Sequence, residues 1–116
     1  YEMVTPQSWM GNPPPSVFSL GVSHQDQVLS LPPGAELVGR NAFCAFAALA
    51  YPSEKAISFQ GHPEYSPAFS CALYGVRKGT ILPTEMVNAA EASFAEPIDN
   101  SLVATWMAQF LQSASN

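Results

Sequence analysis

The chain has 116 residues, 47% of them hydrophobic, and four Lys or Arg against nine Asp or Glu give a net charge of −5. This length suits one domain, and the high apolar and low charged content excludes intrinsic disorder. No apolar run reaches the roughly 20 residues of a membrane helix. The few basic residues are scattered, so we expect no nucleic-acid surface and no membrane surface among the partners.

The first half of the chain predicts short strands after an irregular opening. Residues 1–16 are rich in proline, which fixes φ and removes backbone donors, so an extended connection without helix or central strand is expected there. Its aromatic and Met side chains indicate that it packs against the rest of the domain. Residues 17–22, 35–40 and 56–60 have strand character. The apolar run 43–51 fits a strand or a helix by periodicity, and the regular spacing of turn signals favours a strand.

The second half predicts helices. Ser66 is placed to cap a helix that starts at Pro67 and runs to Arg77 or Lys78, with Gly79 as the residue that terminates it.

A second helix is expected to begin around Pro83 and to stop before Pro97, and a third to follow a cap at Asp99 or Asn100. One face of the second would carry Met86, Ala90 and Phe94. The third has an amphipathic set formed by Leu102, Val103, Trp106, Met107, Phe110 and Leu111. Taken alone, strands followed by three helices suggest an α+β arrangement whose last helix covers an apolar sheet face.

The two cysteines, Cys44 and Cys71, each lie in an apolar stretch and are expected to be buried thiols. Two cysteines are too few for a disulfide scaffold, so a reducing, cytoplasmic location is expected. Two histidines and two separated cysteines provide no ligand pair at zinc spacing. We therefore expect no metal site and no cofactor.

The segment from Gly61 to Glu64 is the most informative for chemistry, because it directly follows a predicted strand. Residues two apart on an extended backbone point to the same side, so His62 and Glu64 could face one cleft while Pro63 keeps the segment extended. A carboxylate beside an imidazole fixes its tautomer and forms the base and orienting half of a nucleophilic triad. The alternative is a His and a Glu that are each hydrogen-bonded locally in a turn.

This segment belongs to a longer resemblance. Residues 59–65 (FQGHPEY) resemble the His-Pro-Glu signature of class I glutamine amidotransferase domains. Residues 23–28 (SHQDQV) and 31–35 (LPPGA) resemble the preceding segment in the branch typified by the GMP-synthase amidotransferase, and 41–48 are similar to the strand between them. The resemblance implies an α/β fold, of which residues 1–116 would be the C-terminal portion of a flavodoxin-like, three-layer domain.

The resemblance also implies a Cys-His-Glu triad that hydrolyses the side-chain amide of glutamine, the small-molecule substrate. His62 would be the general acid and base, and Glu64 would orient it. Ser23, His24 and Gln25 would line the glutamine pocket, although the same loop can be interpreted as a polar strand end that satisfies backbone donors.

The sequence departs from the family at the nucleophile. The family's cysteine sits in a Gly-x-Cys-x-Gly elbow, where the thiol is exposed and neighbouring amides form an oxyanion hole. Neither Cys44 nor Cys71 has that setting. We therefore expect the C-terminal half of a domain that lacks activity alone, with the missing N-terminal half as a partner and self-association through exposed apolar edges.

Two alternatives remain open. One is a non-catalytic amidotransferase-like module that binds a small molecule or a partner subunit. The other is a γ-glutamyl peptidase or hydrolase, which would use the same triad without transferring ammonia.

Overall fold

The computed structural model describes residues 1–11, 13–23, 26–80, 82–95 and 97–114. Its strands are β1 (Glu2–Met3), β2 (Glu36–Arg40), β3 (Ala48–Tyr51) and β4 (Ala56–Phe59). Its helices are the 3-10 turn η1 (Ser8–Met10), α1 (Pro67–Arg77), α2 (Thr84–Ser93) and α3 (Asn100–Ala114). The predicted order of strands followed by three α-helices is confirmed, in an α/β arrangement consistent with a portion of a flavodoxin-like fold.

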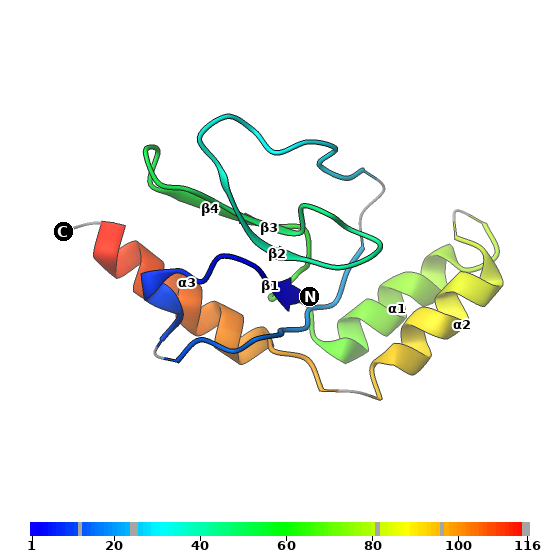
Figure 1. Ribbon diagram of the computed structural model, residues 1–116. Helices are drawn as coiled ribbons and strands as arrows, with labels where there is room; N and C mark the ends of the chain where they lie inside the picture. The colour runs from blue at the N-terminus through cyan, green and yellow to red at the C-terminus, as the bar shows by residue number, and fades with distance from the viewer. Residues whose placement is uncertain (12, 24–25, 81, 96, 115–116) are drawn as a thin grey trace.

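The four strands form one antiparallel sheet in the order β1-β2-β3-β4. In Figure 1, α3 and the N-terminal segment lie against one end of the sheet, while α1 and α2 pack side by side at the other end. The chain is elongated, with extents of 47 × 28 × 23 Å. Over the ranges that the structure describes, no helix combines the length and the apolar character needed to cross a bilayer.

Residues 17–22 do not form the predicted strand. Only Val17 makes a ladder-type bridge, to Glu2, while Phe18 exchanges two backbone hydrogen bonds with Tyr1: its amide donates at 3.0 Å and its carbonyl accepts from the terminal amine at 2.6 Å. The Ser19 carbonyl accepts from the Asp99 amide at 2.8 Å, and the Gly21 carbonyl accepts from His62 at 2.8 Å. Beyond Phe18 the segment bonds to separate elements at isolated positions, so its strand-like composition produces no continuous ladder.

The apolar run 43–51 contains a strand only from Ala48 onward. The side-chain oxygen of Asn41 accepts from the backbone amides of Phe43 at 3.0 Å and Cys44 at 2.6 Å. This local turn, of a kind that Asn favours, occupies the start of the run.

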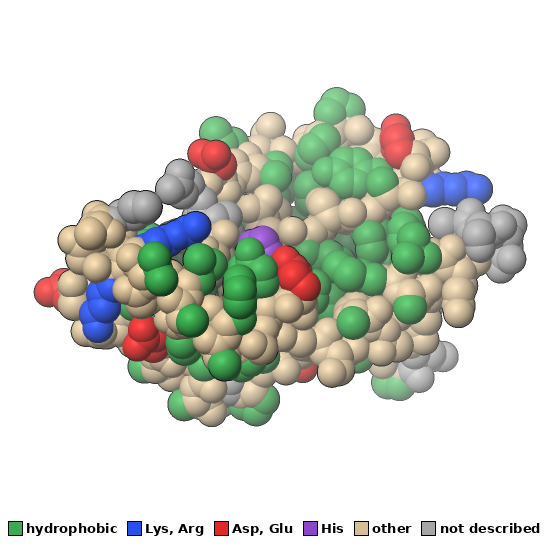
Figure 2. All heavy atoms as spheres, turned by 180° about the vertical axis from the view of Figure 1, so that it is seen from behind, with side chains coloured by type: hydrophobic (Ala, Val, Ile, Leu, Met, Phe, Trp, Pro, Cys, Tyr) green, Lys and Arg blue, Asp and Glu red, His purple; other side chains and the backbone are tan. Residues whose placement is uncertain are grey.

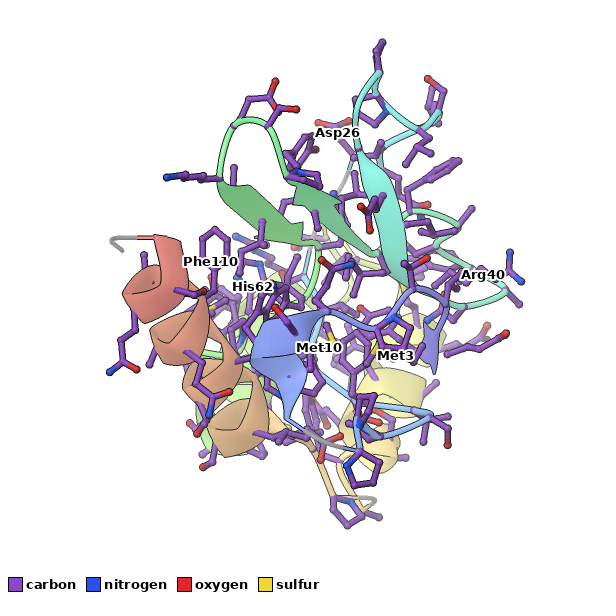
Figure 3. All side chains as sticks on the ribbon, turned by 60° about the vertical axis from the view of Figure 1, so that its left-hand side comes forward. Met3, Met10, Asp26, Arg40, His62 and Phe110 are labelled. Atoms are coloured by element: carbon purple, nitrogen blue, oxygen red, sulfur yellow. The ribbon has the colours of Figure 1, made fainter. Side chains whose placement is uncertain are left out.

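The N-terminal segment packs as predicted, with one difference. Residues 8–10 form the 3-10 turn η1, whereas no helical turn was expected in residues 1–16. Trp9 and Met10 are buried, and Trp9 meets Trp106 edge to face with ring centroids 6.3 Å apart. Met10 and Phe110 lie where η1, α3 and the strands meet (Figure 3).

Helix α1 matches its prediction closely. The Ser66 hydroxyl accepts from the Phe69 amide at 3.1 Å and so caps the helix, which ends at Arg77. Gly79 follows with φ of +76°, a left-handed conformation that glycine adopts without strain.

The apolar face predicted for α2 is right at Ala90 and Phe94, which are half-buried, and wrong at Met86. Val87 is buried, whereas Met86 is 56% exposed. Both are apolar and adjacent, so spacing alone leaves a rotation of one residue undecided. On α3, Val103 and Trp106 form the buried stripe, while Leu102 and Leu111 are exposed.

Candidate functional site

The site lies where the chain leaves β4. His62 follows buried Gly61 and donates its backbone amide to the Gly21 carbonyl at 2.8 Å. A Cβ at Gly61 would stand 2.7 Å from Leu20 Cβ, which is closer than real side chains approach. Glycine therefore allows the extended 17–22 segment to lie directly against the backbone that carries His62.

His62 and Glu64 form the pair that the sequence predicted. The His62 Nδ1 and Glu64 Oε1 atoms are 2.6 Å apart, a charge-assisted hydrogen bond when the carboxylate is ionised. The His62 side chain is 28% exposed and that of Glu64 is 60% exposed, so both reach solvent. Figure 2 shows the histidine at the surface beside acidic and hydrophobic side chains.

The carboxylate sets the protonation pattern of the imidazole. Desolvation acts to raise the pKa of Glu64, but hydrogen bonds from His62 and the backbone, with the charge of His62, lower that pKa below its usual value. An ionised Glu64 can only accept, so Nδ1 carries the hydrogen and Nε2 is left to exchange a proton with a reactant. The pair can therefore act as a general base and acid with its orienting group.

Two further residues complete the surroundings of His62. The Tyr65 ring stacks on the imidazole with centroids 4.2 Å apart and planes within 8°. Asn100, the first residue of α3, donates its Nδ2 to the Tyr65 carbonyl at 2.7 Å. The sequence offered only a weak signal for Tyr65, its position after the His-Pro-Glu segment, and none for Asn100 beyond a possible cap.

The predicted substrate-binding residues are only partly described. Ser23 is half-buried and follows the 17–22 segment, whose Gly21 carbonyl accepts from the His62 amide. His24 and Gln25 lie outside the described residues. Just before Ser23, the Val22 carbonyl accepts a hydrogen bond from the Tyr74 hydroxyl. Burial is the main reason that the pKa of Tyr74 is raised.

Neither cysteine completes a triad with His62. Cys44 is buried in the turn before β3, as predicted, and Cys71 is half-buried within α1. Both are free thiols, and no hydrogen bond links either of them to His62 across the part of the chain that the structure describes. No group of three or more His, Cys, Asp or Glu among the described residues could hold a metal ion.

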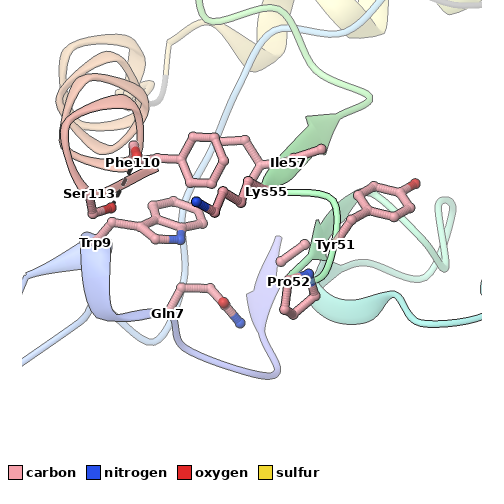
Figure 4. Close-up of a pocket in the computed structure, with 10 residues that line it drawn as sticks. Gln7, Trp9, Tyr51, Pro52, Lys55, Ile57, Phe110 and Ser113 are labelled. Atoms are coloured by element: carbon pink, nitrogen blue, oxygen red, sulfur yellow. Dashed lines mark hydrogen bonds between the residues drawn. The ribbon is translucent and has the colours of Figure 1, made fainter. Parts of the chain in front are cut away.

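Two hollows in the described part of the chain are separate from the His62–Glu64 pair, which lines neither of them. The larger, of about 330 Å³, is bordered by Ser19, Gly21, Tyr74 and Phe94. The smaller, of about 190 Å³, lies between η1, the β3–β4 turn and the end of α3. Figure 4 shows its lining, formed by Gln7, Trp9, Ala50, Tyr51, Pro52, Lys55, Ala56, Ile57, Phe110 and Ser113.

Comparison with known proteins gives one informative similarity. No protein-family model matches the chain, and no solved structure matches it. A Schizosaccharomyces pombe protein named "putative glutamine amidotransferase-like protein" is 33% identical over 96 residues, which cover 82% of this chain and 38% of that protein. The chain thus spans well under half the length of this relative. The similarity supports the general glutamine amidotransferase-like family for this chain.

Proposed function

We propose that this chain supplies the acid–base half of a class I glutamine amidotransferase site. The observation that carries the proposal is the 2.6 Å contact between His62 Nδ1 and Glu64 Oε1, within a segment that resembles the family's His-Pro-Glu signature. The similarity to a glutamine amidotransferase-like protein supports the same function. Within the family, the GMP-synthase-type branch is the one that residues 23–35 resemble.

The proposed reaction uses His62 twice. Its Nε2 takes the proton from a cysteine thiol, and the thiolate attacks the side-chain amide carbon of glutamine. The tetrahedral intermediate breaks its C–N bond, ammonia leaves with the proton from His62, and a γ-glutamyl thioester remains. Water then attacks the thioester while His62 accepts its proton, and glutamate is released with the thiol restored. Glu64 holds the imidazole in the required tautomer and stabilises its protonated form.

The nucleophile is proposed to come from sequence outside these residues. Cys44 is buried and Cys71 lies inside α1, so neither sits on a strand-to-helix elbow. The relative extends well beyond the 38% of its length matched here, which leaves room for the other half of such a domain. In this proposal residues 1–116 are the C-terminal part of one cytoplasmic amidotransferase-like domain, and Ser23, His24 and Gln25 line its glutamine pocket.

The test is glutamine hydrolysis by a longer version of the protein that includes the preceding sequence. We expect glutamate release from that version and none from the 116 residues alone. His62→Ala should abolish hydrolysis, and Glu64→Gln should lower kcat about 100-fold or more through loss of the orienting carboxylate. Thr105→Ala, a matched change on the exposed side of α3, should leave the rate unchanged. Hydrolysis that survives His62→Ala would show that the triad assignment is wrong.

A second candidate is a non-catalytic amidotransferase-like binding module. Such a module would keep His62 and Glu64 without a nucleophile and would bind a small molecule or a partner subunit without cleaving it. It predicts that the preceding codons of the gene also lack a Gly-x-Cys-x-Gly motif. A γ-glutamyl hydrolase with the same triad would instead release glutamate from γ-glutamyl peptides in the same assay.

Apolar side chains on the surface bear on the partner of this chain. Phe43, Val76 and Leu111 are each more than 60% exposed. Apolar surface favours association where it is contiguous, as at the edges and faces that an incomplete sheet would expose. We propose that the 116 residues alone form oligomers and that the preceding half-domain covers part of this surface. A monodisperse monomer in size-exclusion chromatography would contradict this.

A further inference from the structure

We propose that Asn100 and Tyr65 are positioning residues that hold the His62 imidazole in its working orientation. The inference rests on the proposed function of His62 as the acid–base group. It assigns to the first turn of α3 a role in the site that neither the sequence motif nor the similarity to a relative indicates.

The imidazole is constrained from two directions. Glu64 binds the ring edge at Nδ1, at 2.6 Å, and Tyr65 lies flat on the ring face, 4.2 Å away and within 8° of parallel. One contact fixes which nitrogen faces the carboxylate, and the other fixes the plane of the ring. With only one of them, the ring could rotate and turn Nε2 away from a reactant. The Phe69 ring also contacts the Tyr65 ring, with centroids 4.7 Å apart and planes at 53°, and this contact limits the movement of Tyr65.

Asn100 holds the backbone that presents Tyr65. Its Nδ2 donates to the Tyr65 carbonyl at 2.7 Å across 35 residues of sequence. The Tyr65 amide in turn donates to the His62 carbonyl at 3.2 Å and closes a tight turn. A hydrogen bond to this turn from a helix end therefore fixes the position of the stacked ring.

Asp99, which precedes Asn100, connects the same end of α3 to the 17–22 segment by hydrogen bonds. Asp99 accepts from the Ser19 amide at 2.7 Å through Oδ2 and donates its own amide to the Ser19 carbonyl at 2.8 Å. Two residues further on, the Gly21 carbonyl accepts from the His62 amide. The start of α3 is thus hydrogen-bonded to two segments: residues 17–22, which accept from the His62 amide, and the turn 62–65, which contains His62.

The amide of Asn100 is used as a donor. Its Oδ1 is buried and has no hydrogen-bond partner among the residues that the structure describes. An unpaired buried acceptor costs stability, so the contact made by Nδ2 is the one that accounts for Asn at this position. Asn100→Asp keeps the shape and suits a helix N-terminus, but it replaces the donor with an acceptor facing the Tyr65 carbonyl.

The test is NMR of the 116-residue chain with labelled histidine. His24 and His62 are its two histidines, so a His24→Asn variant assigns the signals. A stacked Tyr65 shifts the His62 ring protons upfield. In Asn100→Asp we expect this shift to be largely lost and the Nδ1 signal to move toward that of a solvent-exposed histidine. Thr105→Ala, on the same helix, should leave both unchanged.

A second variant covers the case in which Asn100→Asp does not fold. Tyr65→Leu removes the stack and leaves Asn100 and its backbone partner in place, and it should also abolish the upfield shift. If Asn100→Asp folds and the His62 signals stay as in the unaltered chain, the positioning role is wrong and Asn100 merely supports the helix. If the shift is absent from the unaltered chain, the stack itself is wrong.

An activity measurement separates this inference from the proposed function. In the longer version of the protein, Asn100→Asp should lower kcat about 10- to 100-fold with little change in KM, because misplacement of a reacting group affects the transition state. An inactive unaltered protein with the NMR shifts intact would overturn the glutaminase proposal and leave the positioning of His62 standing. A change in KM alone would overturn the positioning role.

Discussion

Replacing Gly61 by Ala would place a methyl group in the closest backbone contact of the site. The added Cβ would stand 2.7 Å from Leu20 Cβ, 3.0 Å from Leu20 Cδ1 and 3.3 Å from the Gly21 carbonyl oxygen. The nearest of these atoms is attached to the main chain and cannot rotate away. The 17–22 segment and the backbone of His62 must therefore move apart, which weakens the His62–Gly21 hydrogen bond as well.

The expected cost follows from overpacking. Inserting a methyl group into a well-packed site costs about 1–3 kcal/mol of unfolding free energy. With a urea m-value of about 1.5 kcal/mol per molar, the unfolding midpoint should fall by roughly 0.7–2 M. Leu20→Ala should not rescue the variant, because Ala keeps the Cβ that makes the closest contact. Gly75→Ala is the matched control: nothing lies within 4 Å of its added Cβ, so on α1 it should stabilise by about 1 kcal/mol.

Urea unfolding followed by tryptophan fluorescence measures both variants, because Trp9 and Trp106 are buried and become exposed on unfolding. The reasoning is refuted if Gly61→Ala unfolds at the same urea concentration as the unaltered chain. It is also refuted if Leu20→Ala restores the midpoint of Gly61→Ala.

Three further predictions concern the same framework. Because the pKa of Glu64 is lowered, its ionised carboxylate contributes under about 1 kcal/mol to stability at this exposure. This contribution is present above the ordinary carboxyl pKa and is lost as pH falls through the lower native pKa. Carboxyl ¹³C NMR and an acid titration of Glu64→Gln check it, and an ordinary pKa of Glu64 would contradict it. Burial raises the pKa of Tyr1 to about 12, so ultraviolet absorbance should show a phenol that ionises near pH 12. The contribution of the buried neutral phenol to stability should be complete below the ordinary pKa near 10 and should be lost as pH rises through 12. Trp106→Ala should cost about 3–5 kcal/mol, because the indole is 1% exposed and packs against Phe18 at 5.4 Å; a loss under about 1 kcal/mol in the urea assay would place it outside the core.

Local features were predictable from the sequence because short-range rules govern them. The i, i+2 spacing around Pro63 was enough to place His62 and Glu64 on one side, and they meet at 2.6 Å. Ser66 and Gly79 bound α1 as capping preferences indicate. Asp99 precedes the first residue of α3, yet its carboxylate accepts from Ser19 rather than from the helix, which no capping rule predicts.

The sequence by itself therefore determined the order of the elements, the caps of α1 and the pairing of His62 with Glu64. Only the tertiary structure decided that residues 17–22 form no continuous strand and lie against the site, that α2 buries Val87 instead of Met86, and that Asn100 holds the turn of Tyr65. The reason is the separation along the chain: 2 residues part His62 from Glu64, whereas 35 part Asn100 from Tyr65 and 80 part Ser19 from Asp99. Contacts across such distances depend on how whole elements pack, and no local pattern of residue types encodes them.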